Sequence, residues 1–200
     1  MIILEFYFDF GSPTAYLAYQ RLLQLQQQYD LDIDYKPMLL GGVFKATGNH
    51  SPAAIPAKGL YMMTQDLPRF AKRYNVAFRM NSHFPINTLT LMRGAHAALD
   101  QGCFPAYCKA VFEAMWIHNV NLADPDALRS ALDNAELNSE AILNATQDAA
   151  VKARLVSITE EAVTRGVFGA PTLFVGEQMF FGQDRLDFVE ELLTEAKQER

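Results

Sequence analysis

The sequence predicts an α/β protein in which strands near the two ends flank a long helical segment. A β-α-β pattern opens the chain, helical periodicity dominates its middle, and a β-β-α pattern closes it. Glycine and proline residues separate these parts, as they do at the turns of ordinary globular proteins.

The opening β-α-β unit occupies residues 2–37. Residues 2–8 form an apolar run typical of a buried strand, and residues 13–28 place most apolar side chains on one side of a helix. Ser12 and Pro13 suit the cap and the first turn of that helix. Residues 31–37 alternate between apolar and polar types, which predicts a second strand. The two strands should be parallel, because a helix connects them.

The middle of the chain is predicted to be mostly helical. Residues 38–49 are rich in glycine, and we expect a loop with a short helical turn there. Helical periodicity then runs from residue 58 to about 165, with four breaks: residues 81–87, the neighbourhood of Gly102, residues 119–125 and residues 134–138.

The closing unit is predicted to be a hairpin followed by a helix. Residues 172–175 and 178–181 form two short apolar strands joined by a Gly-Glu turn. We expect the final helix to begin at Asp184, because apolar residues recur at helical spacing after it.

Composition limits the possible functions. The chain has 200 residues, 50% of them hydrophobic, and a formal net charge of -6 without a basic run, which argues against a general nucleic-acid binder. We expect a cytoplasmic protein, because we find no apolar run of about 18 residues and no signal peptide. Cys103 and Cys108 lie five apart in a predicted helix, which argues against a disulfide framework and a cysteine metal site. The histidines show no metal-ligand spacing, so no metal is expected.

Two short segments carry the candidate chemistry. After the first strand, Ser12 and Pro13 open a helix, and free backbone N–H groups at a helix N-terminus favour an anion. Near the other end, Pro171 stands directly before a strand, where a cis peptide can expose backbone groups to a ligand. We interpret the two segments as halves of one site.

This order of elements resembles the thioredoxin fold with the helical insertion of the DsbA-like group. That group carries Cys-x-x-Cys at the start of the first helix, whereas this chain has Ser12-Pro13-Thr14-Ala15. Disulfide exchange by protein cysteines is excluded at this position, because the attacking group must be a thiolate. The resemblance implies a thioredoxin-like domain made of residues 1–44 and 166–200 and a helical insertion domain made of residues 45–165.

Six segments more specifically resemble the 2-hydroxychromene-2-carboxylate isomerases, which are related to the kappa-class glutathione transferases. The segments are residues 8–13, 41–49, 56–58, 84–89, 166–172 and 180–186. The resemblance implies glutathione as cofactor, a small aromatic carboxylate as substrate and, commonly, a homodimer. The implied reaction interconverts 2-hydroxychromene-2-carboxylate and trans-o-hydroxybenzylidenepyruvate in the catabolism of naphthalene-type compounds.

The resemblance also assigns roles to individual residues. Ser12 is the catalytic residue and stabilises the glutathione thiolate, while Lys45 and Phe84 face the substrate. The other residues implied to bind glutathione are Asn49, Ala170, cis-Pro171, Phe181, Gly182, Gln183 and Asp184.

Each of these residues also has a purely structural interpretation. Ser12 and Asp184 suit helix caps, Pro171 suits a trans proline beside an edge strand, and Lys45 and Asn49 suit solvated loop positions. Lys58 and Arg185 are weaker candidates for carboxylate partners. Asn87, Trp116 and His118 suit either an aromatic pocket or core packing, and for Trp116 we favour packing.

Two alternative functions remain open. A kappa-type transferase or peroxidase would use the same Ser12 and Pro171 but a different substrate wall. A non-catalytic thioredoxin-fold binding module would have no affinity for glutathione.

Overall fold

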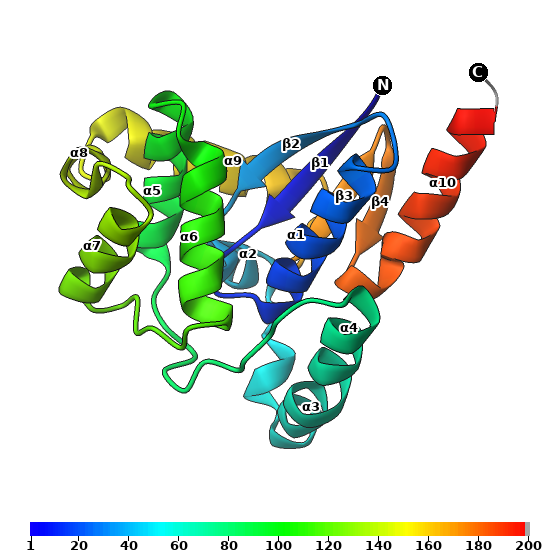
Figure 1. Ribbon diagram of the computed structural model, residues 1–200, viewed down its shortest axis with the longest axis horizontal. Helices are drawn as coiled ribbons and strands as arrows, with labels where there is room; N and C mark the ends of the chain where they lie inside the picture. Colours follow the sequence, from blue (N-terminus) through cyan, green and yellow to red (C-terminus); the bar gives the residue numbers. More distant parts are fainter. Residues whose placement is uncertain (199–200) are drawn as a thin grey trace.

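A four-stranded mixed sheet forms the centre of the computed structural model, which describes residues 1–198 (Figure 1). The strand order is β2-β1-β3-β4. β1 (Ile2–Phe8) runs parallel to β2 (Leu31–Pro37) and antiparallel to β3 (Thr172–Val175), which forms a hairpin with β4 (Gln178–Phe181). The predicted strands, the parallel pair and the hairpin are confirmed.

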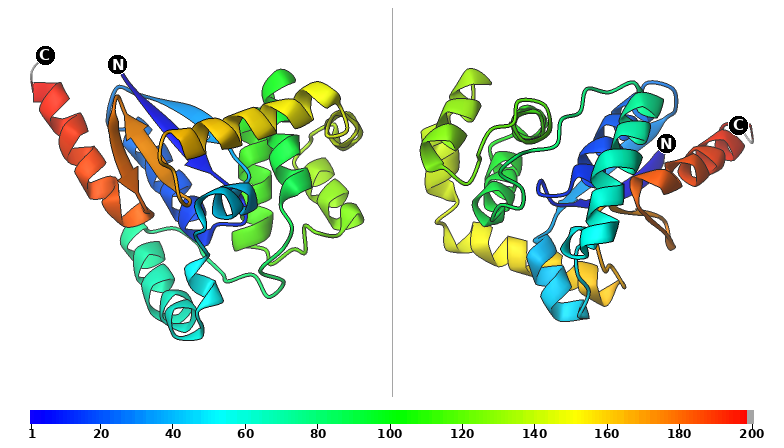
Figure 2. Two further views of the ribbon diagram at one scale, coloured as in Figure 1. Left: turned by 180° about the vertical axis from the view of Figure 1, so that it is seen from behind. Right: turned by 90° about the horizontal axis from the view of Figure 1, so that it is seen from below.

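Alternate residues of β1 pack on opposite faces of the sheet, as the pleat of a strand requires. Phe6 and Phe8 belong to the larger core, which includes α1 (Pro13–Gln26) and the apolar side of α10 (Leu186–Gln198). Tyr7 belongs to a smaller core on the other face, formed with residues of α9 (Ala149–Thr164) and β3. Figure 2 shows α9 crossing this second face.

The segment between the two halves of the sheet is mostly helical, and the four predicted breaks are present. The first break is longer than predicted, from residue 75 to 88, and an unpredicted break at residues 146–148 precedes α9. Helices α5 to α8 lie beside the β2 edge, and α3 and α4 lie together at one end of the molecule (Figure 1). Their bounds are α3 (Pro56–Tyr61), α4 (Leu67–Tyr74), α5 (Leu89–Asp100), α6 (Phe104–Trp116), α7 (Pro125–Asn134) and α8 (Ser139–Ala145), with a 3-10 turn at Pro52–Ala54 and a π turn at Met62–Asp66.

Three local expectations were wrong. Residues 38–49 form more than a loop, because α2 (Leu40–Thr47) is a full helix whose Val43 packs in the second core. This packing outweighs the low helix propensity of its two glycines. The final α-helix begins at Leu186, after a 3-10 turn at Gln183–Arg185, and Cys103 precedes α6 rather than lying inside it.

Of the two expected domain boundaries, the first falls inside a helix and the second falls after one. Residues 44 and 45 both lie within α2, whereas residues 165 and 166 follow the end of α9. A two-domain division therefore remains a proposal, and α9 of the insertion covers one face of the sheet.

A polar cluster fixes the C-terminal end of α9 to the sheet. The Arg165 guanidinium donates to the Glu5 carboxylate at 2.7 Å and to the Tyr7 hydroxyl at 2.9 Å, and it lies 3.9 Å from the Phe174 ring centroid. The Tyr7 hydroxyl donates to Glu161 at 2.6 Å, and burial raises the pKa of this phenol well above its ordinary value. The cluster positions the loop that leads from α9 to Pro171.

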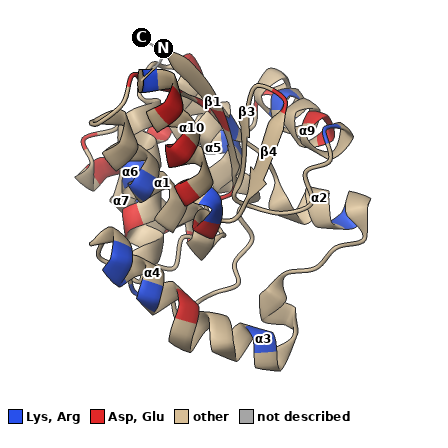
Figure 3. Cartoon of the chain, turned by 90° about the vertical axis from the view of Figure 1, so that its right-hand side faces the viewer, with Lys and Arg blue, Asp and Glu red and all other residues tan. Residues whose placement is uncertain are grey.

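The surface carries charges of both signs. Figure 3 shows Lys and Arg interspersed with Asp and Glu on α1, α4 and α10 rather than gathered on one basic face. Within residues 1–198, the helices lack the combination of length and apolar character that a membrane span requires. Cys103 and Cys108 are free thiols.

Candidate functional site

A buried carboxylate holds the loop that follows β1. Asp9 is 1% exposed, and its side chain accepts hydrogen bonds from Gly11 N–H at 2.9 Å, Leu40 N–H at 2.9 Å and the Thr88 hydroxyl at 3.0 Å. Burial raises the pKa of Asp9, and the three donors oppose that rise. Asp9 therefore ties the loop to the starts of α2 and α5. The sequence signal for it was one acid inside an aromatic strand end, and we had assigned it no role.

Core contacts fix the same loop from the other side. Trp116 is fully buried, and its indole Nε1 donates to the carbonyl of Phe10 at 2.9 Å. The packing interpretation of Trp116 is thereby confirmed. The loop is rigidly held before it reaches the first turn of α1.

Ser12 caps α1 and faces the loop before Pro171. Its Oγ accepts from Ala15 N–H at 3.1 Å and donates to the carbonyl of Ala170 at 3.1 Å. The Thr14 hydroxyl lies 2.9 Å from Ser12 Oγ and also donates to the Ala170 carbonyl, at 3.2 Å. Thr14 alone can thus hold this carbonyl while the Ser12 hydrogen turns toward another acceptor. We had assigned Thr14 no role from the sequence.

The N-terminus of α1 keeps its partial positive charge. No acidic side chain lies in the first turn of this 14-residue helix. The aligned peptide dipoles and free N–H groups therefore favour an anion beside Ser12.

The opposite wall is formed by residues 168–170, and Pro171 is buried behind them. The Ala170–Pro171 peptide is cis, as we predicted. We expected both backbone groups of Ala170 to be free, but its carbonyl already accepts the two hydroxyl hydrogen bonds from α1. Its N–H has no hydrogen-bond partner among residues 1–198, so this donor alone is available to a ligand. The Asn49 side chain donates to the carbonyl of Phe168 at 2.8 Å and so holds this wall.

A glycine turn completes the site at the end of β4. Gly182 has φ +98°, and its N–H donates to the Pro171 carbonyl at 3.0 Å. A Cβ at this position would lie 2.4 Å from Asp184 Oδ1, so a larger residue would force the turn to shift. The Asp184 carboxylate pairs with Arg185, and both side chains remain partly exposed.

These elements surround one cleft of about 460 Å³. It brings together most of the residues implicated from the sequence, namely Ser12, Asn49, Lys58, Phe84, Ala170, Phe181, Gly182, Gln183 and Asp184, and adds Thr14, Phe44 and His50. An adjoining recess of about 390 Å³ shares Phe44 and Phe84 with the cleft and adds Ile86 and Asn87. The cleft and the recess therefore adjoin one another and share part of their walls.

Pro171, Lys45 and His118 do not line this cleft, so Pro171 shapes the wall through its cis peptide without facing the cleft. Leu40 and Phe44 are four residues apart on α2, so both face the cleft, whereas the next residue, Lys45, is rotated by about 100° and is exposed. The sequence predicts a loop at Lys45, but Lys45 lies in α2 and its position on the helix directs it away from the cleft. His118 lines a separate hollow beside α6.

Within residues 1–198 there is no group of three or more His, Cys, Asp or Glu side chains arranged to hold a metal ion. The cleft itself offers hydroxyls, backbone N–H groups and the N-terminus of α1.

Fold and site together define the class of protein. The DSBA-like thioredoxin domain matches residues 3–194, so the chain belongs to the DsbA-like thioredoxin-domain family. A 2-hydroxychromene-2-carboxylate isomerase from Sphingobium xenophagum is 31% identical over 96% of this chain and 98% of that protein. Within the DsbA-like group, the chain belongs to the family of these isomerases.

Two further proteins are similar to this chain over nearly its whole length. The solved structure of a 2-hydroxychromene-2-carboxylate isomerase superimposes with a TM-score of 0.88 and 30% identity, covering 99% of this chain and 97% of the other. Human glutathione S-transferase kappa 1 is 26% identical over 96% of this chain and 90% of its own length.

Proposed function

We propose that the protein is a glutathione-dependent isomerase that interconverts 2-hydroxychromene-2-carboxylate and trans-o-hydroxybenzylidenepyruvate. The observation that carries the proposal is the Ser12 hydroxyl, which lies at the N-terminus of α1 in a cleft whose opposite wall offers an unpaired N–H at Ala170. The similarity to proteins named 2-hydroxychromene-2-carboxylate isomerase supports this reaction.

The residues of the cleft fit glutathione. The Ala170 N–H suits a peptide carbonyl, in the manner of an added strand. The backbone N–H groups of Gln183 and Asp184, which have no acceptor among the described residues, suit a carboxylate, and the Asp184 side chain suits an ammonium group. The unpaired Ala170 N–H argues most directly for a ligand with a peptide backbone. When bound, glutathione supplies a thiol that adds to and leaves the conjugated substrate without being consumed.

Ser12 and Thr14 have different roles at the thiol position. Thr14 donates to the Ala170 carbonyl, so the hydrogen on Ser12 Oγ can point into the cleft and stabilise a negative charge there. The α1 N-terminus adds to this stabilisation. Both effects favour a thiolate at neutral pH, whereas an unperturbed thiol has a pKa of about 8.5.

The adjoining recess suits the aromatic substrate. Phe44, Phe84 and Ile86 provide apolar walls, and Lys58 lines the neighbouring cleft. We propose that Lys58 holds the substrate carboxylate. The family resemblance instead implies Lys45, so both lysines need testing.

A kappa-type transferase is the second candidate, because a relative named glutathione S-transferase kappa 1 spans nearly the whole chain. A transferase would bind glutathione in the same cleft. The two reactions would differ in the second substrate, which occupies the recess: an electrophile that becomes conjugated, or a carboxylate that is isomerised. The resemblance further implies a homodimer in the cytoplasm, and sedimentation velocity would test the dimer.

Ultraviolet absorbance can follow the isomerisation with glutathione, with S-methylglutathione and with neither. We expect turnover only with the free thiol, because the methylated compound keeps the backbone groups but cannot form a thiolate. Equal rates in the three reactions would contradict the proposal. Conjugation of chlorodinitrobenzene without isomerisation would favour the transferase, and a binding module would do neither.

A further inference from the structure

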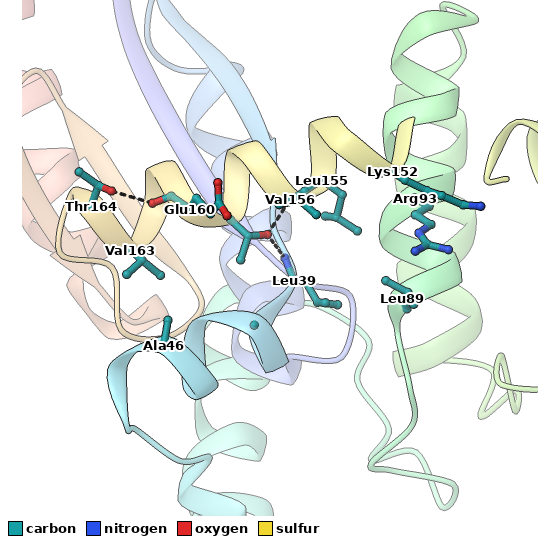
Figure 4. A pocket seen from close by; sticks show the side chains of 12 residues that line it. Leu39, Ala46, Leu89, Arg93, Lys152, Leu155, Val156, Glu160, Val163 and Thr164 are labelled. Carbon is teal, nitrogen blue, oxygen red and sulfur yellow. Dashed lines mark hydrogen bonds between the residues drawn. The ribbon is translucent and has the colours of Figure 1, made fainter. Parts of the chain in front are cut away.

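A second hollow lies on the other side of α2, between α2, α5 and α9 (Figure 4). Its volume is about 450 Å³, and it shares no lining residue with the Ser12 cleft. We call it the α9 groove. Its walls are largely apolar, formed by Leu39, Gly42, Ala46, Leu89, Leu155, Val156 and Val163.

Two cations line one end of the α9 groove. Arg93 comes from α5 and Lys152 from α9, and Figure 4 shows their side chains at the same end. Neither side chain forms an ion pair within residues 1–198. The nearby acid Asp100 is already committed to Arg154, so it does not neutralise this end.

The Arg93 guanidinium has an unsatisfied buried atom. Its Nε has almost no solvent exposure and no hydrogen-bond partner among the described residues. Because Nε is closed to solvent, a molecule in the groove can reach only the two Nη groups, which form no hydrogen bond or ion pair among the described residues. A carboxylate is the acceptor that a guanidinium pairs with best.

The other polar groups of the α9 groove do not compete for this role. The Thr159 hydroxyl accepts from Leu39 N–H at 3.0 Å and donates to the Leu155 carbonyl at 2.7 Å. Glu160 is exposed and lies away from the cationic end, toward Thr164 (Figure 4). The groove therefore offers an apolar body with positive charge at one end.

We propose that the α9 groove binds a small amphipathic monocarboxylate. The carboxylate pairs with Arg93 and Lys152, and a hydrocarbon body lies against Leu155 and the neighbouring apolar walls. The volume falls within the range of about 300–1,000 Å³ that is typical of small-molecule pockets. Charge complementarity selects a monocarboxylate over a neutral or cationic compound.

The test uses octanoate as probe and amide NMR on the full chain, with glutathione present to fill the Ser12 cleft. We expect saturable shifts at residues 89–93 and 152–164, and at least tenfold weaker binding of the neutral analogue octanamide. Arg93→Gln should weaken octanoate binding about tenfold or more, the effect of losing one charge-assisted hydrogen bond. Arg129→Gln, the same charge change at an exposed position of α7, should leave it unchanged.

A second variant tests the apolar end without altering charge. Ala46 is exposed on α2 and lines the α9 groove, so Ala46→Phe should fold normally and block octanoate by filling the space. Shifts confined to residues 11–14 and 181–184, or equal affinity of wild type and Arg93→Gln, would overturn the proposal. Absence of octanoate binding to the wild type would also overturn it. If octanoate does not bind and Ala46→Phe dissociates a dimer, the groove is an interface between two copies of the chain instead. The isomerisation assay reports on the Ser12 cleft separately.

Discussion

Replacing Ser12 with alanine removes two interactions whose sizes can be estimated separately. The Ser12 side chain accepts the Ala15 N–H as the cap of α1, and loss of such a cap costs about 1 kcal/mol of folding stability. For a chain of this size we expect the melting temperature to fall by roughly 2–4 °C. The fold should therefore survive the substitution.

The effect on the bound thiol should be larger than the effect on stability. A hydrogen bond to a charged group contributes about 1.5–3 kcal/mol, and one pKa unit corresponds to about 1.36 kcal/mol. Ser12→Ala should accordingly raise the pKa of bound glutathione by about one to two units. The acid limb of the activity profile should move to higher pH by the same amount, because less thiolate is present at neutral pH.

Thiolate absorbance in the ultraviolet, measured on glutathione complexes across pH, reads this pKa directly. Ser12→Thr keeps both a cap and a hydroxyl, so the thiol pKa of this variant should stay close to the wild-type value. Thr14→Val keeps the cap but leaves the Ala170 carbonyl to Ser12, so it should also raise the thiol pKa. A thiol pKa that is the same in wild type and Ser12→Ala would refute the role of the hydroxyl.

Three further predictions address the surrounding residues. Lys58→Gln should raise KM for the carboxylate substrate several-fold without changing glutathione affinity, and Lys45→Gln should change neither; the reverse pattern would restore Lys45 to the site. Gly182→Ala should weaken glutathione binding measured by calorimetry, whereas Gly102→Ala, with φ +69° and open space around its Cβ, should cost only stability, by about 1–2 kcal/mol. Asp9→Asn should flatten the pH dependence of the free energy of unfolding measured by chemical denaturation. Burial raises the pKa of Asp9 above its ordinary value of 3.8, so the wild type should lose stability relative to the variant as pH rises through the raised pKa. Parallel stability curves for the two proteins would contradict this.

Much of the fold could be predicted because local patterns and tertiary packing agree. The run at residues 2–8 is apolar on both faces because helices cover both sides of β1. The four predicted helix breaks contain glycine, asparagine or proline, residues whose backbone preferences end helices, whereas the unpredicted break at residues 146–148 contains none of them. The exception is α2, because its helicity depends on Val43 reaching a core that adjacent sequence does not reveal.

The site was less predictable than the fold, because it depends on orientation. The pairing of Ser12 with the loop before Pro171 followed from motifs, but the occupied carbonyl of Ala170 did not. Lys45 lies one residue from Phe44, and only the helical phase of α2 shows that one faces the cleft and the other does not. Asp9 lies in the 8–13 motif, but its structural role was not predictable, because two of its three donors, Leu40 N–H and the Thr88 hydroxyl, come from distant segments.

The central claim is that glutathione binds in the cleft with its thiol beside Ser12. Amide NMR on the uniformly labelled chain, titrated with glutathione, tests this most directly. We predict saturable shifts concentrated at residues 11–15, 168–171 and 181–185, with those at 11–15 reduced for S-methylglutathione. Saturable shifts elsewhere, or none at millimolar glutathione, would contradict the account.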